Sequence, residues 1–325
     1  MEGKGIEVTV KTPSRLHFCM IDLRGDLGRI HGSVGVTIDN PNIILKAKAA
    51  SSVEVKGSRA DRIKSFAETI LARSGISGGV SIELLSDIME HSGFGSGTQL
   101  ALAVGTAISE LYGLHSTVEE IALKLDRSRR SGIGTFAFKH GGFNVDAGHK
   151  VGDTRRIPPL FFRADFPDNW RFVIGVPSIP TKKSGSSEKN AFNKLNPPPA
   201  TLTAEISRII LMQMIPAIIE EDIVSFGKAI TSVDFKFGQF WAEIQGGCFT
   251  HPIIERGIAF LADSGSLGQG QSSWGPAFYG LSENEGQAQK ICIGLEKFLN
   301  QDKRKGRAFI AQPNNHGASV SKTSI

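Results

Sequence analysis

Cysteine is scarce in this chain, which has 3 among its 325 residues. Cys19, Cys248 and Cys292 lie far apart and form no C-x-x-C pair, which excludes a zinc knuckle or redox dithiol made of neighbouring cysteines. So few cysteines also exclude a miniature fold held together by disulfides. Because low cysteine use fits a reducing compartment, we expect a cytoplasmic protein.

Long hydrophobic runs are also missing. The most apolar stretch, Leu202 to Ile219, contains Glu205 and Arg208, which argues against a membrane span. The first residues lead into an alternating strand instead of an apolar core, so we expect no signal peptide. Hydrophobic residues make up 40% and charged residues 21% of the chain, a globular composition that excludes disorder as the main state.

The excess of positive charge is small. Lys and Arg number 37 against 32 Asp and Glu, for a net charge of +5. This bias favours anionic partners, and phosphorylated metabolites qualify as well as nucleic acids. The densest basic run, Lys303 to Arg307, has no interleaved aromatic residues, so we interpret it as a solvated turn and disfavour a nucleic-acid partner.

The periodicity of apolar residues predicts an α+β protein in two domains. Alternating or short apolar runs predict strands at 6–11, 34–38, 43–47, 52–55, 80–85, 170–176, 277–281 and 308–310. Helical spacing predicts helices at 63–71, 99–112, 116–125, 202–215, 222–233, 253–262 and 288–299. We therefore predict a strand-rich domain over residues 1–180 and a helix-rich domain over 181–325, with a cleft between them. The stretch 177–199, rich in Pro, Ser, Lys and Asn, predicts a linker or loop.

The most distinctive local feature is a glycine-rich loop, Gly93-Phe94-Gly95-Ser96-Gly97-Thr98, between a predicted strand and a buried helix. Glycines let backbone N–H groups approach an anion closely, and a helix N-terminus carries about half a positive charge. The loop therefore suits a phosphate or diphosphate, although it matches neither G-x-x-x-x-G-K-[ST] nor G-x-G-x-x-G. A tight turn before a capped helix is the structural alternative.

Polar residues also follow the first predicted strand. Arg15 offers a planar fork for phosphate oxygens, and Asp22 is able to hold a metal ion or face a developing cation. Taken singly, each is more often part of a surface ion pair. Two further glycine-rich segments, 132–148 and 268–276, let the backbone pass close to a ligand or another strand. Trp274 in the second segment is able to stack on a flat ring, with a half-buried structural role as the alternative.

Four segments taken together resemble the GHMP kinase superfamily of galacto-, homoserine, mevalonate and phosphomevalonate kinases. They are Pro13 to Arg15, the loop Gly93 to Thr98, Ser131 to Gly142, and Gly268 to Pro276. The resemblance covers nearly the whole chain in the expected order. It implies the two-domain fold of that family, with a ribosomal-protein-like N-terminal domain and a ferredoxin-like C-terminal domain around one cleft.

Two positions depart from the kinase pattern. The catalytic aspartate of the kinases falls on Gly134, and the usual second serine of their phosphate loop falls on Gly97. Losing a positioned general base typically lowers the rate by a factor of about 10² to 10⁴, so an ordinary hydroxyl kinase is disfavoured. The alternative of an ATP-dependent small-molecule kinase would need another base, such as Asp126 or Asp146.

Several strings instead resemble one non-kinase branch, the beta-ribofuranosylaminobenzene 5'-phosphate synthases. They are Ser14 to His17, Ile21 to Leu23, Gly93 to Gln99, Arg130 to Thr135, His140 to Phe143 and Gln271 to Pro276. The resemblance implies a pentosyltransferase of methanopterin biosynthesis. In its reaction phosphoribosyl diphosphate condenses with 4-aminobenzoate or 4-hydroxybenzoate, which forms a carbon–carbon bond to the sugar and releases diphosphate and CO2.

The resemblance also implies roles for individual residues. Arg15, Arg130 and the glycine-rich loop would stabilise the departing diphosphate, together with Mg²⁺, whose protein ligands the sequence does not assign. Asp22 would stabilise an oxocarbenium-like ribose, and either His17 or His140 would handle a proton or bind the aromatic carboxylate. The implied substrate-binding set is Arg15, Gly93, Gly95, Ser96, Gly97, Thr98, Gln99, Arg130, Ser272 and Trp274. No redox cofactor is expected, because the ring itself serves as the electron sink.

An alternative from another class is a non-catalytic module that binds phosphometabolites or nucleic acid, since the N-terminal fold resembles a ribosomal-protein fold. It predicts strongly salt-dependent binding without turnover. The expected partners are otherwise the small-molecule substrates, with no membrane. The sequence leaves open a homodimer, residual ATP binding and the preferred benzoate.

Overall fold

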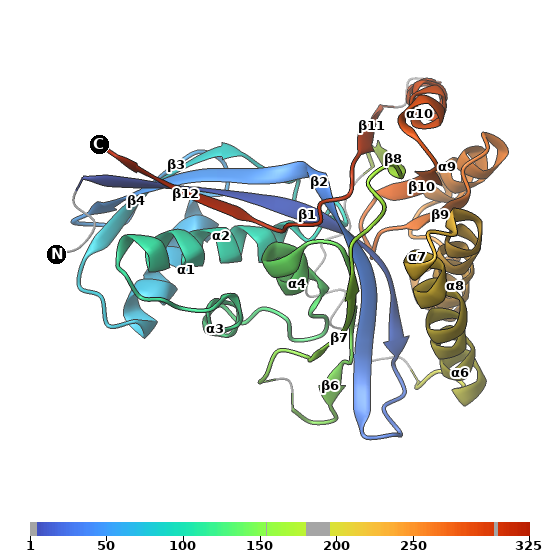
Figure 1. Cartoon of the computed structure of the whole chain (residues 1–325), viewed down its shortest axis with the longest axis horizontal. Helices are drawn as coiled ribbons and strands as arrows, with labels where there is room; N and C mark the ends of the chain where they lie inside the picture. Colours follow the sequence, from blue (N-terminus) through green and yellow to red (C-terminus); the bar gives the residue numbers. More distant parts are fainter. Residues whose placement is uncertain (1–4, 154, 180–195, 302–304) are drawn as a thin grey trace.

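The computed structural model describes residues 5–153, 155–179, 196–301 and 305–325. Two β-sheets, each covered by helices, make up the molecule (Figure 1). Helices account for 38% and strands for 30% of the residues, which confirms the predicted α+β class.

Two long antiparallel strands, β1 (Ile6–Asp22) and β2 (Arg29–Ala50), run through the first sheet and bend on their way across the molecule (Figure 1). The sheet has 8 strands in the order β12-β1-β2-β4-β3, with β5 and β6 paired to β2 and β7 paired to β5. The other strands are β3 (Glu54–Lys56), β4 (Gly79–Ser86), β5 (Phe143–Asp146), β6 (His149–Lys150), β7 (Leu160–Ala164) and β12 (Ser319–Ser324).

Helices α1 to α4 cover one face of this sheet. They are α1 (Ala60–Arg73), α2 (Ser96–Leu111), α3 (Val118–Lys124) and α4 (Ile133–His140). Because its residues are almost all small or apolar, α2 is buried nearly all round between the sheet and its neighbouring helices, as predicted.

The second sheet has 4 antiparallel strands in the order β11-β8-β10-β9. They are β8 (Arg171–Pro177), β9 (Gly268–Gln271), β10 (Phe278–Ser282) and β11 (Gly306–Ala311). Helices α9 (Pro252–Asp263) and α10 (Glu285–Leu299) pack on it around Val173 and Phe278.

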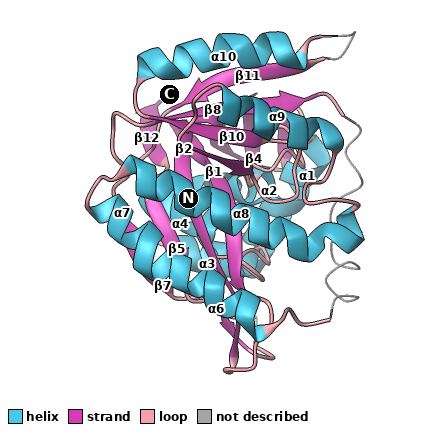
Figure 2. Ribbon diagram, turned by 90° about the vertical axis from the view of Figure 1, so that its right-hand side faces the viewer, coloured by secondary structure: helices cyan, strands magenta, loops and turns pink. Residues whose placement is uncertain are grey.

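A helical layer joins the two sheets. It contains α6 (Ala200–Ile209), the π-helical turn η1 (Ile210–Met214), α7 (Ile215–Ile219) and α8 (Ile223–Gln245). Figure 2 shows these helices in front of the strands, and both α6 and α8 contact β1. One hydrophobic core therefore runs from the first sheet to α8, with Phe226 of α8 against Phe18 and Phe143.

The strands are longer than their sequence patterns predict. The predictions at 34–38 and 43–47 both fall in β2, and the segment Thr12 to His17 lies inside β1 and not after it. Pro13 fits in β1 because the pairing with β2 shifts register between Thr12 and Ser14, where the ladder does not need its missing N–H. The pattern missed β9, which is made of Gly and Gln, and β12, which is exposed throughout.

Two helix boundaries also differ. The capping box is formed by Thr117 with Glu120, one residue later than the predicted Ser116 and Glu119. The helix predicted to stop before Pro216 continues through it, because the wider π-helical turn before it accommodates a residue without an N–H.

Two strands cross the predicted domain boundary between residues 180 and 181. β8, from the predicted first domain, is an inner strand of the second sheet, and β12, from the predicted second domain, pairs with β1. Most of the predicted loop 177–199 lies outside the described residues, as do residues 303 and 304 of the basic run, whose last two residues, Gly306 and Arg307, begin β11.

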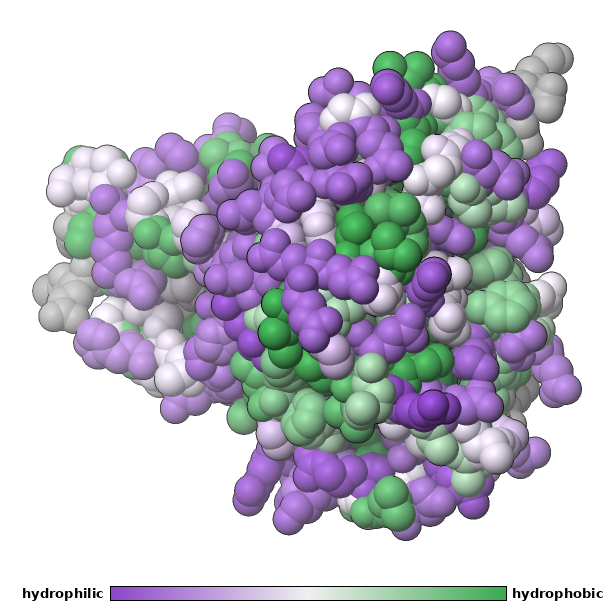
Figure 3. Space-filling view, turned by 45° about the vertical axis from the view of Figure 1, so that its right-hand side comes forward, coloured by the Kyte–Doolittle hydropathy of each residue, from purple (hydrophilic) through white to green (hydrophobic). Residues whose placement is uncertain are grey.

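The continuous helix Ala200–Ile219 is, by length and composition alone, apolar enough to cross a membrane, and 28% of it is buried. Leu211, Met212 and Ile219 are among its exposed side chains. On the face drawn in Figure 3, apolar surface (green) gathers in separate patches between polar residues and forms no continuous band. Because this helix packs on α8 and β1, we interpret it as part of the core layer.

Candidate active site

The glycine-rich loop forms one wall of a cavity of about 200 Å³, called here the loop pocket. Gly93 and Gly95 adopt positive φ angles of 99° and 78°, a conformation that favours glycine. Gly95 is the N-cap of α2, and no side chain caps the first turn. The N-terminus of a buried helix therefore faces the pocket, together with the hydroxyl-bearing residues Ser96 and Thr98.

Three arginines from separate elements line the loop pocket. Arg15 on β1 donates a hydrogen bond from Nη1 to the carbonyl oxygen of Gly93. Arg62 on α1 and Arg127 after α3 lie over the ring of Phe66, with guanidinium carbons 5.7 and 5.8 Å from its centroid. Burial lowers the pKa of Arg127, and neighbouring Arg62 adds to that shift. Guanidinium groups packed this closely favour an anion between them.

Gly97 is the loop position where the kinases usually have a serine. A Cβ atom at Gly97 would lie 2.7 Å from Nη2 of Arg62 and 3.8 Å from Nη1 of Arg127. Glycine at this position therefore leaves room for the guanidinium groups.

Hydrogen bonds join the loop to two segments that are distant in sequence. The hydroxyl of Ser272 donates to the carbonyl of Gly93 at 2.8 Å and accepts from the amide of His17 at 3.1 Å. The amide of Ser273 donates to the carbonyl of His17 at 3.1 Å. Trp274 lines the pocket, and its ring meets that of Trp241 edge-on at 4.7 Å. Three of the four predicted segments therefore come together here.

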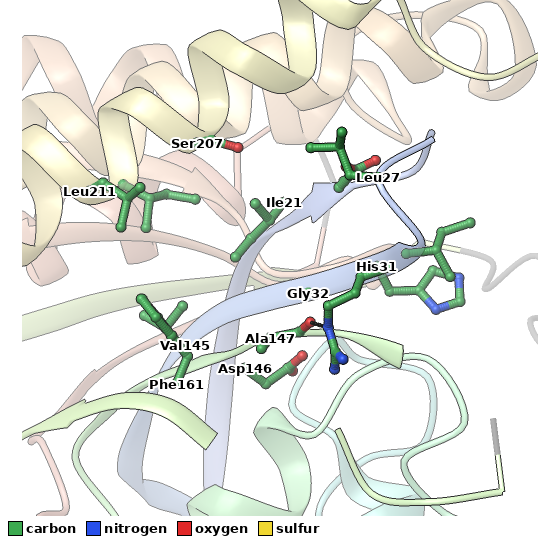
Figure 4. Close-up of a pocket in the computed structure, with 14 residues that line it drawn as sticks. Ile21, Leu27, His31, Gly32, Val145, Asp146, Ala147, Phe161, Ser207 and Leu211 are labelled. Atoms are coloured by element: carbon green, nitrogen blue, oxygen red, sulfur yellow. Dashed lines mark hydrogen bonds between the residues drawn. The ribbon is translucent and has the colours of Figure 1, made fainter. Parts of the chain in front are cut away.

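A second cavity of about 310 Å³, the apolar cleft, lies between the end of the β1–β2 hairpin and the helical layer. In Figure 4, Ser207 and Leu211 enter it from the helices, while Val145, Asp146 and Phe161 approach from the strands on the opposite side. Its other apolar lining residues are Ile21, Leu27, Ile30 and Ile210.

Four ionisable residues line the apolar cleft: Asp22, Arg29, His31 and Asp146. Oδ1 of Asp22 accepts hydrogen bonds from the amides of Arg24 at 2.6 Å and Gly25 at 3.0 Å, which fixes the carboxylate on the hairpin turn. Burial lowers the pKa of His31 to about 4, and His149 contributes to the shift. The cleft thus combines apolar walls with a few fixed polar groups, as small-molecule sites do.

Asp146 is fully buried at the end of β5. Its carboxylate accepts hydrogen bonds from the amides of Gly132 at 2.8 Å and Gly148 at 2.9 Å. Burial raises the pKa of Asp146 to about 6, although these hydrogen bonds oppose the shift.

The first turn of α4 connects the two cavities. Gly132 donates to Asp146 on the cleft side, while a Cβ atom at Gly134 would lie 3.1 Å from Cγ2 of Thr98 on the loop side. Gln99 is buried and donates from its amide to the carbonyl of Gly134 at 2.8 Å. One helical turn therefore separates the glycine-rich loop from the cleft, and the position of the kinase aspartate carries no acid.

Several predicted site residues lie elsewhere. Gln99 and Ser272 position the loop but line neither cavity, and Arg130 lines neither, although its charge lowers the pKa of His31. His140 stacks on Phe136 at the end of α4, with ring centroids 6.4 Å apart, and also lines neither cavity.

His17 is buried beneath the loop pocket. Burial, assisted by the charge of Arg15, lowers its pKa to about 3, so the ring is neutral near pH 7. It lines a small cavity of about 20 Å³ with Asp234, whose carboxylate accepts a hydrogen bond from the amide of Gln271 at 3.1 Å. The roles predicted for His17 and His140 stay predictions.

The sequence did not identify Arg62 of the loop pocket or Phe161, Ser207 and Leu211 of the cleft as site residues. Arg127 belongs to a basic cluster visible in the sequence, so its charge was a usable signal. The other residues lie on helices and strands. There the sequence pattern indicates which face of the element is buried, but not which side chains line a cavity.

The predicted Mg²⁺ has few protein ligands available. Among the described residues no group of three or more His, Cys, Asp or Glu side chains is placed to hold a metal ion. The loop pocket offers the hydroxyls of Ser96 and Thr98, and no carboxylate lines it. This fits an ion that is bound mainly through substrate phosphates, as Mg²⁺ commonly is.

Comparison with known proteins decides the family. Residues 61–142 match the GHMP kinases N terminal domain. Proteins named beta-ribofuranosylphenol 5'-phosphate synthase from Archaeoglobus fulgidus and Methanothermobacter thermautotrophicus are 34% and 35% identical to this chain, over 96% and 98% of it and 98% and 99% of their own length. The chain belongs to the beta-ribofuranosylphenol 5'-phosphate synthase family.

Membership in this synthase family confirms the predicted non-kinase branch and an enzyme of the transferase type. It supports transfer of a ribosyl phosphate. A homoserine kinase from Cytophaga hutchinsonii superimposes with a TM-score of 0.69 at 18% identity, covering 97% of each chain, which confirms the GHMP-kinase-like fold alone. A cytoplasmic location and a homodimer stay predictions.

Proposed function

We propose that this synthase-family chain transfers the 5-phosphoribosyl group of phosphoribosyl diphosphate to 4-hydroxybenzoate or 4-aminobenzoate. The C1–O bond to diphosphate breaks, C1 bonds to the ring carbon that carries the carboxylate, and that carboxylate leaves as CO2. The electron pair of the broken C–CO2 bond returns to the ring and restores its aromaticity. We assign the product to methanopterin biosynthesis, as the resemblance implies.

The main support for this proposal is that the loop pocket and the apolar cleft lie next to each other. The loop pocket, with Arg15, Arg62 and Arg127, suits the diphosphate, and the apolar cleft suits an aromatic ring. Since one turn of α4 separates them, a ribose bound over Gly132 to Gly134 would place C1 between leaving group and acceptor.

Asp22 is the residue that would stabilise the positive charge on ribose. Its carboxylate lines the cleft and is held by two backbone amides, so it needs no reorganisation when charge develops. Mg²⁺ bound to the diphosphate would neutralise part of its charge.

The acceptor choice follows from the names of the relatives. A ribofuranosylphenol retains a ring hydroxyl, so it corresponds to 4-hydroxybenzoate, whereas 4-aminobenzoate would yield the aminobenzene product. We propose 4-hydroxybenzoate as the preferred acceptor.

The test is to incubate the protein with phosphoribosyl diphosphate, Mg²⁺ and each benzoate labelled in the carboxyl carbon. We expect labelled CO2 and one equivalent of diphosphate, with the higher rate for 4-hydroxybenzoate. Reactions without the ribosyl donor are the control. Absence of CO2 with both rings would reject the synthase.

A kinase is the second candidate, because Asp146 lines the cleft and its pKa of about 6 suits a general base. Both of its oxygens accept backbone hydrogen bonds, however, which argues for a structural role. ATP with a panel of small alcohols separates the two candidates. ADP release that requires Asp146 would favour the kinase.

A further inference from the structure

A third cavity of about 220 Å³, the basic pocket, adjoins the apolar cleft, because Arg29 lines both. Its other ionisable lining residues are His149, Lys150, Asp153 and Arg156. Cavities for drug-sized ligands usually measure about 300 to 1,000 Å³, so this one suits a small charged group. Nothing in the proposed assignment of the diphosphate or the ring uses this pocket.

The charge of the basic pocket is positive even though Asp153 lines it. Asp153 already accepts hydrogen bonds from the amide of Arg155 at 3.0 Å and from its Nε at 3.2 Å. That ion pair offsets the carboxylate, while Lys150 and Arg156 are exposed with their charges available to the pocket. A dianion would therefore be attracted here.

Arg29 is fixed before any ligand arrives. Its Nε donates to the carbonyl of Ala147 at 2.8 Å and its Nη2 donates to the carbonyl of Gly148 at 2.7 Å. A guanidinium held in this way loses little conformational freedom when it binds an anion.

His149 supplies an independent sign of a ligand. The residue is 3% exposed, and no hydrogen bond to a described residue engages its Nε2 atom. A buried polar atom without a partner is unfavourable unless something else satisfies it. A phosphate group in the basic pocket would do so, because its negative charge favours the protonated ring, whose Nε2–H donates to a phosphate oxygen.

We propose that the basic pocket binds a sugar phosphomonoester, and specifically the 5'-phosphate of the ribosyl donor. The second half of this statement rests on the proposed function. Phosphoribosyl diphosphate carries anionic groups at both ends, and the loop pocket accounts for one of them. With the ring in the apolar cleft, the basic pocket beside it receives the other through Arg29, Lys150 and Arg156.

The first experiment measures binding without turnover. Ribose 5-phosphate is titrated by calorimetry into the wild-type chain, the double variant Lys150→Gln/Arg156→Gln, Arg15→Ala, and Arg256→Ala. Arg256 is an exposed cation on α9 that lines none of the three cavities, so it is the matched control for charge. We expect the double variant to bind at least about 10-fold more weakly and the other two to bind like wild type.

Two outcomes overturn the proposal. One is unchanged binding in the double variant, or no binding to the wild type. The other is a loss confined to Arg15→Ala, which would place the phosphomonoester at the glycine-rich loop. Inorganic phosphate, titrated in parallel, shows whether the sugar contributes: we expect weaker binding that responds to the same double variant. Because both substituted residues are exposed, melting temperatures should stay within a few degrees of wild type.

The second experiment measures turnover. The double variant should raise KM for phosphoribosyl diphosphate about 10-fold and leave KM for 4-hydroxybenzoate unchanged. An unchanged KM for the donor contradicts the assignment to its 5'-phosphate. If no CO2 forms but ribose 5-phosphate binding is lost in the double variant, the proposed reaction fails and the phosphomonoester site stands.

Discussion

The loop pocket and the apolar cleft are built by different means. The loop pocket is mainly a backbone structure, with Gly93 and Gly95 at positive φ and Ser272 tying the loop to His17. The walls of the cleft are side chains from separate segments, among them Phe161 on β7 and Leu211 in η1. Backbone amides and arginines recognise charge, whereas packed apolar side chains recognise shape. Under the proposed function, the anion therefore belongs in the loop pocket and the aromatic ring in the apolar cleft.

The largest expected effect is on turnover in Asp22→Asn. Removing the negative charge at the cleft should lower kcat at least about 100-fold, as loss of a transition-state stabiliser does. Stability should hardly change, because Oδ1 accepts both hydrogen bonds of the turn and asparagine keeps that oxygen. Asp22→Ala is the control: it should lose the same activity and also about 1 kcal/mol of stability. Full activity in Asp22→Asn would show that the negative charge of Asp22 does not contribute to catalysis.

The next effect concerns Asp146, which lines the apolar cleft beside the first turn of α4. Its pKa is raised from 3.8 to about 6, so the folded state retains a proton that the unfolded state releases. The stabilisation that comes from this proton is fully present below pH 4, decreases as the pH rises toward 6 and is lost above pH 6. The free energy of unfolding changes by about 3 kcal/mol over this range. Urea unfolding of wild type and Asp146→Asn between pH 4 and 7 measures it. The stability difference between the two proteins should fall over pH 4 to 6 and then stay level; a pH-independent difference would contradict the shift.

Arg15→Ala tests whether the loop pocket binds the ribosyl donor independently of the cleft. Loss of the guanidinium should lower kcat/KM for phosphoribosyl diphosphate about 10- to 100-fold, the usual range for a hydrogen bond to a charged group. KM for the benzoate should not change, because Arg15 does not line the cleft. Steady-state kinetics with each substrate varied in turn separates the two. Equal increases in both KM values would mean that the cavities are not functionally distinct.

The smallest effect is expected for Leu211→Ala on the cleft side. Shortening this half-exposed side chain removes about 1 kcal/mol of apolar contact with the ring, so KM for 4-hydroxybenzoate should rise roughly 5-fold. The neighbouring Met212 is 73% exposed and does not line the cleft, so Met212→Ala should leave both KM values unchanged. Identical kinetics in the two variants would contradict the location of the ring.

The shape of the loop was predictable from sequence because it depends on local backbone geometry. Glycines at 93 and 95 before an apolar helix predict a tight turn at a helix N-terminus, which the structure has, and phosphate binding there stays a prediction. The cleft was not predictable, because Ile21, Phe161 and Leu211 have the same apolar character as core residues. Only the pairing of β2 with β5 and the packing of α6 on β1 bring them together. Asp22 belongs to a motif that the sequence shows, but its distance from the loop does not follow from the sequence, because the alternation that predicts this strand ends at residue 11 whereas β1 continues to Asp22.

The pairing of β12 with β1 has a consequence for biosynthesis. β1 is translated long before residues 319–324, which cover one of its two edges. Until those residues leave the ribosome, the edge of β1 presents unpaired N–H and C=O groups to other nascent chains. The first sheet of this enzyme is therefore completed only after residues 319–324 have been translated, long after β1 itself.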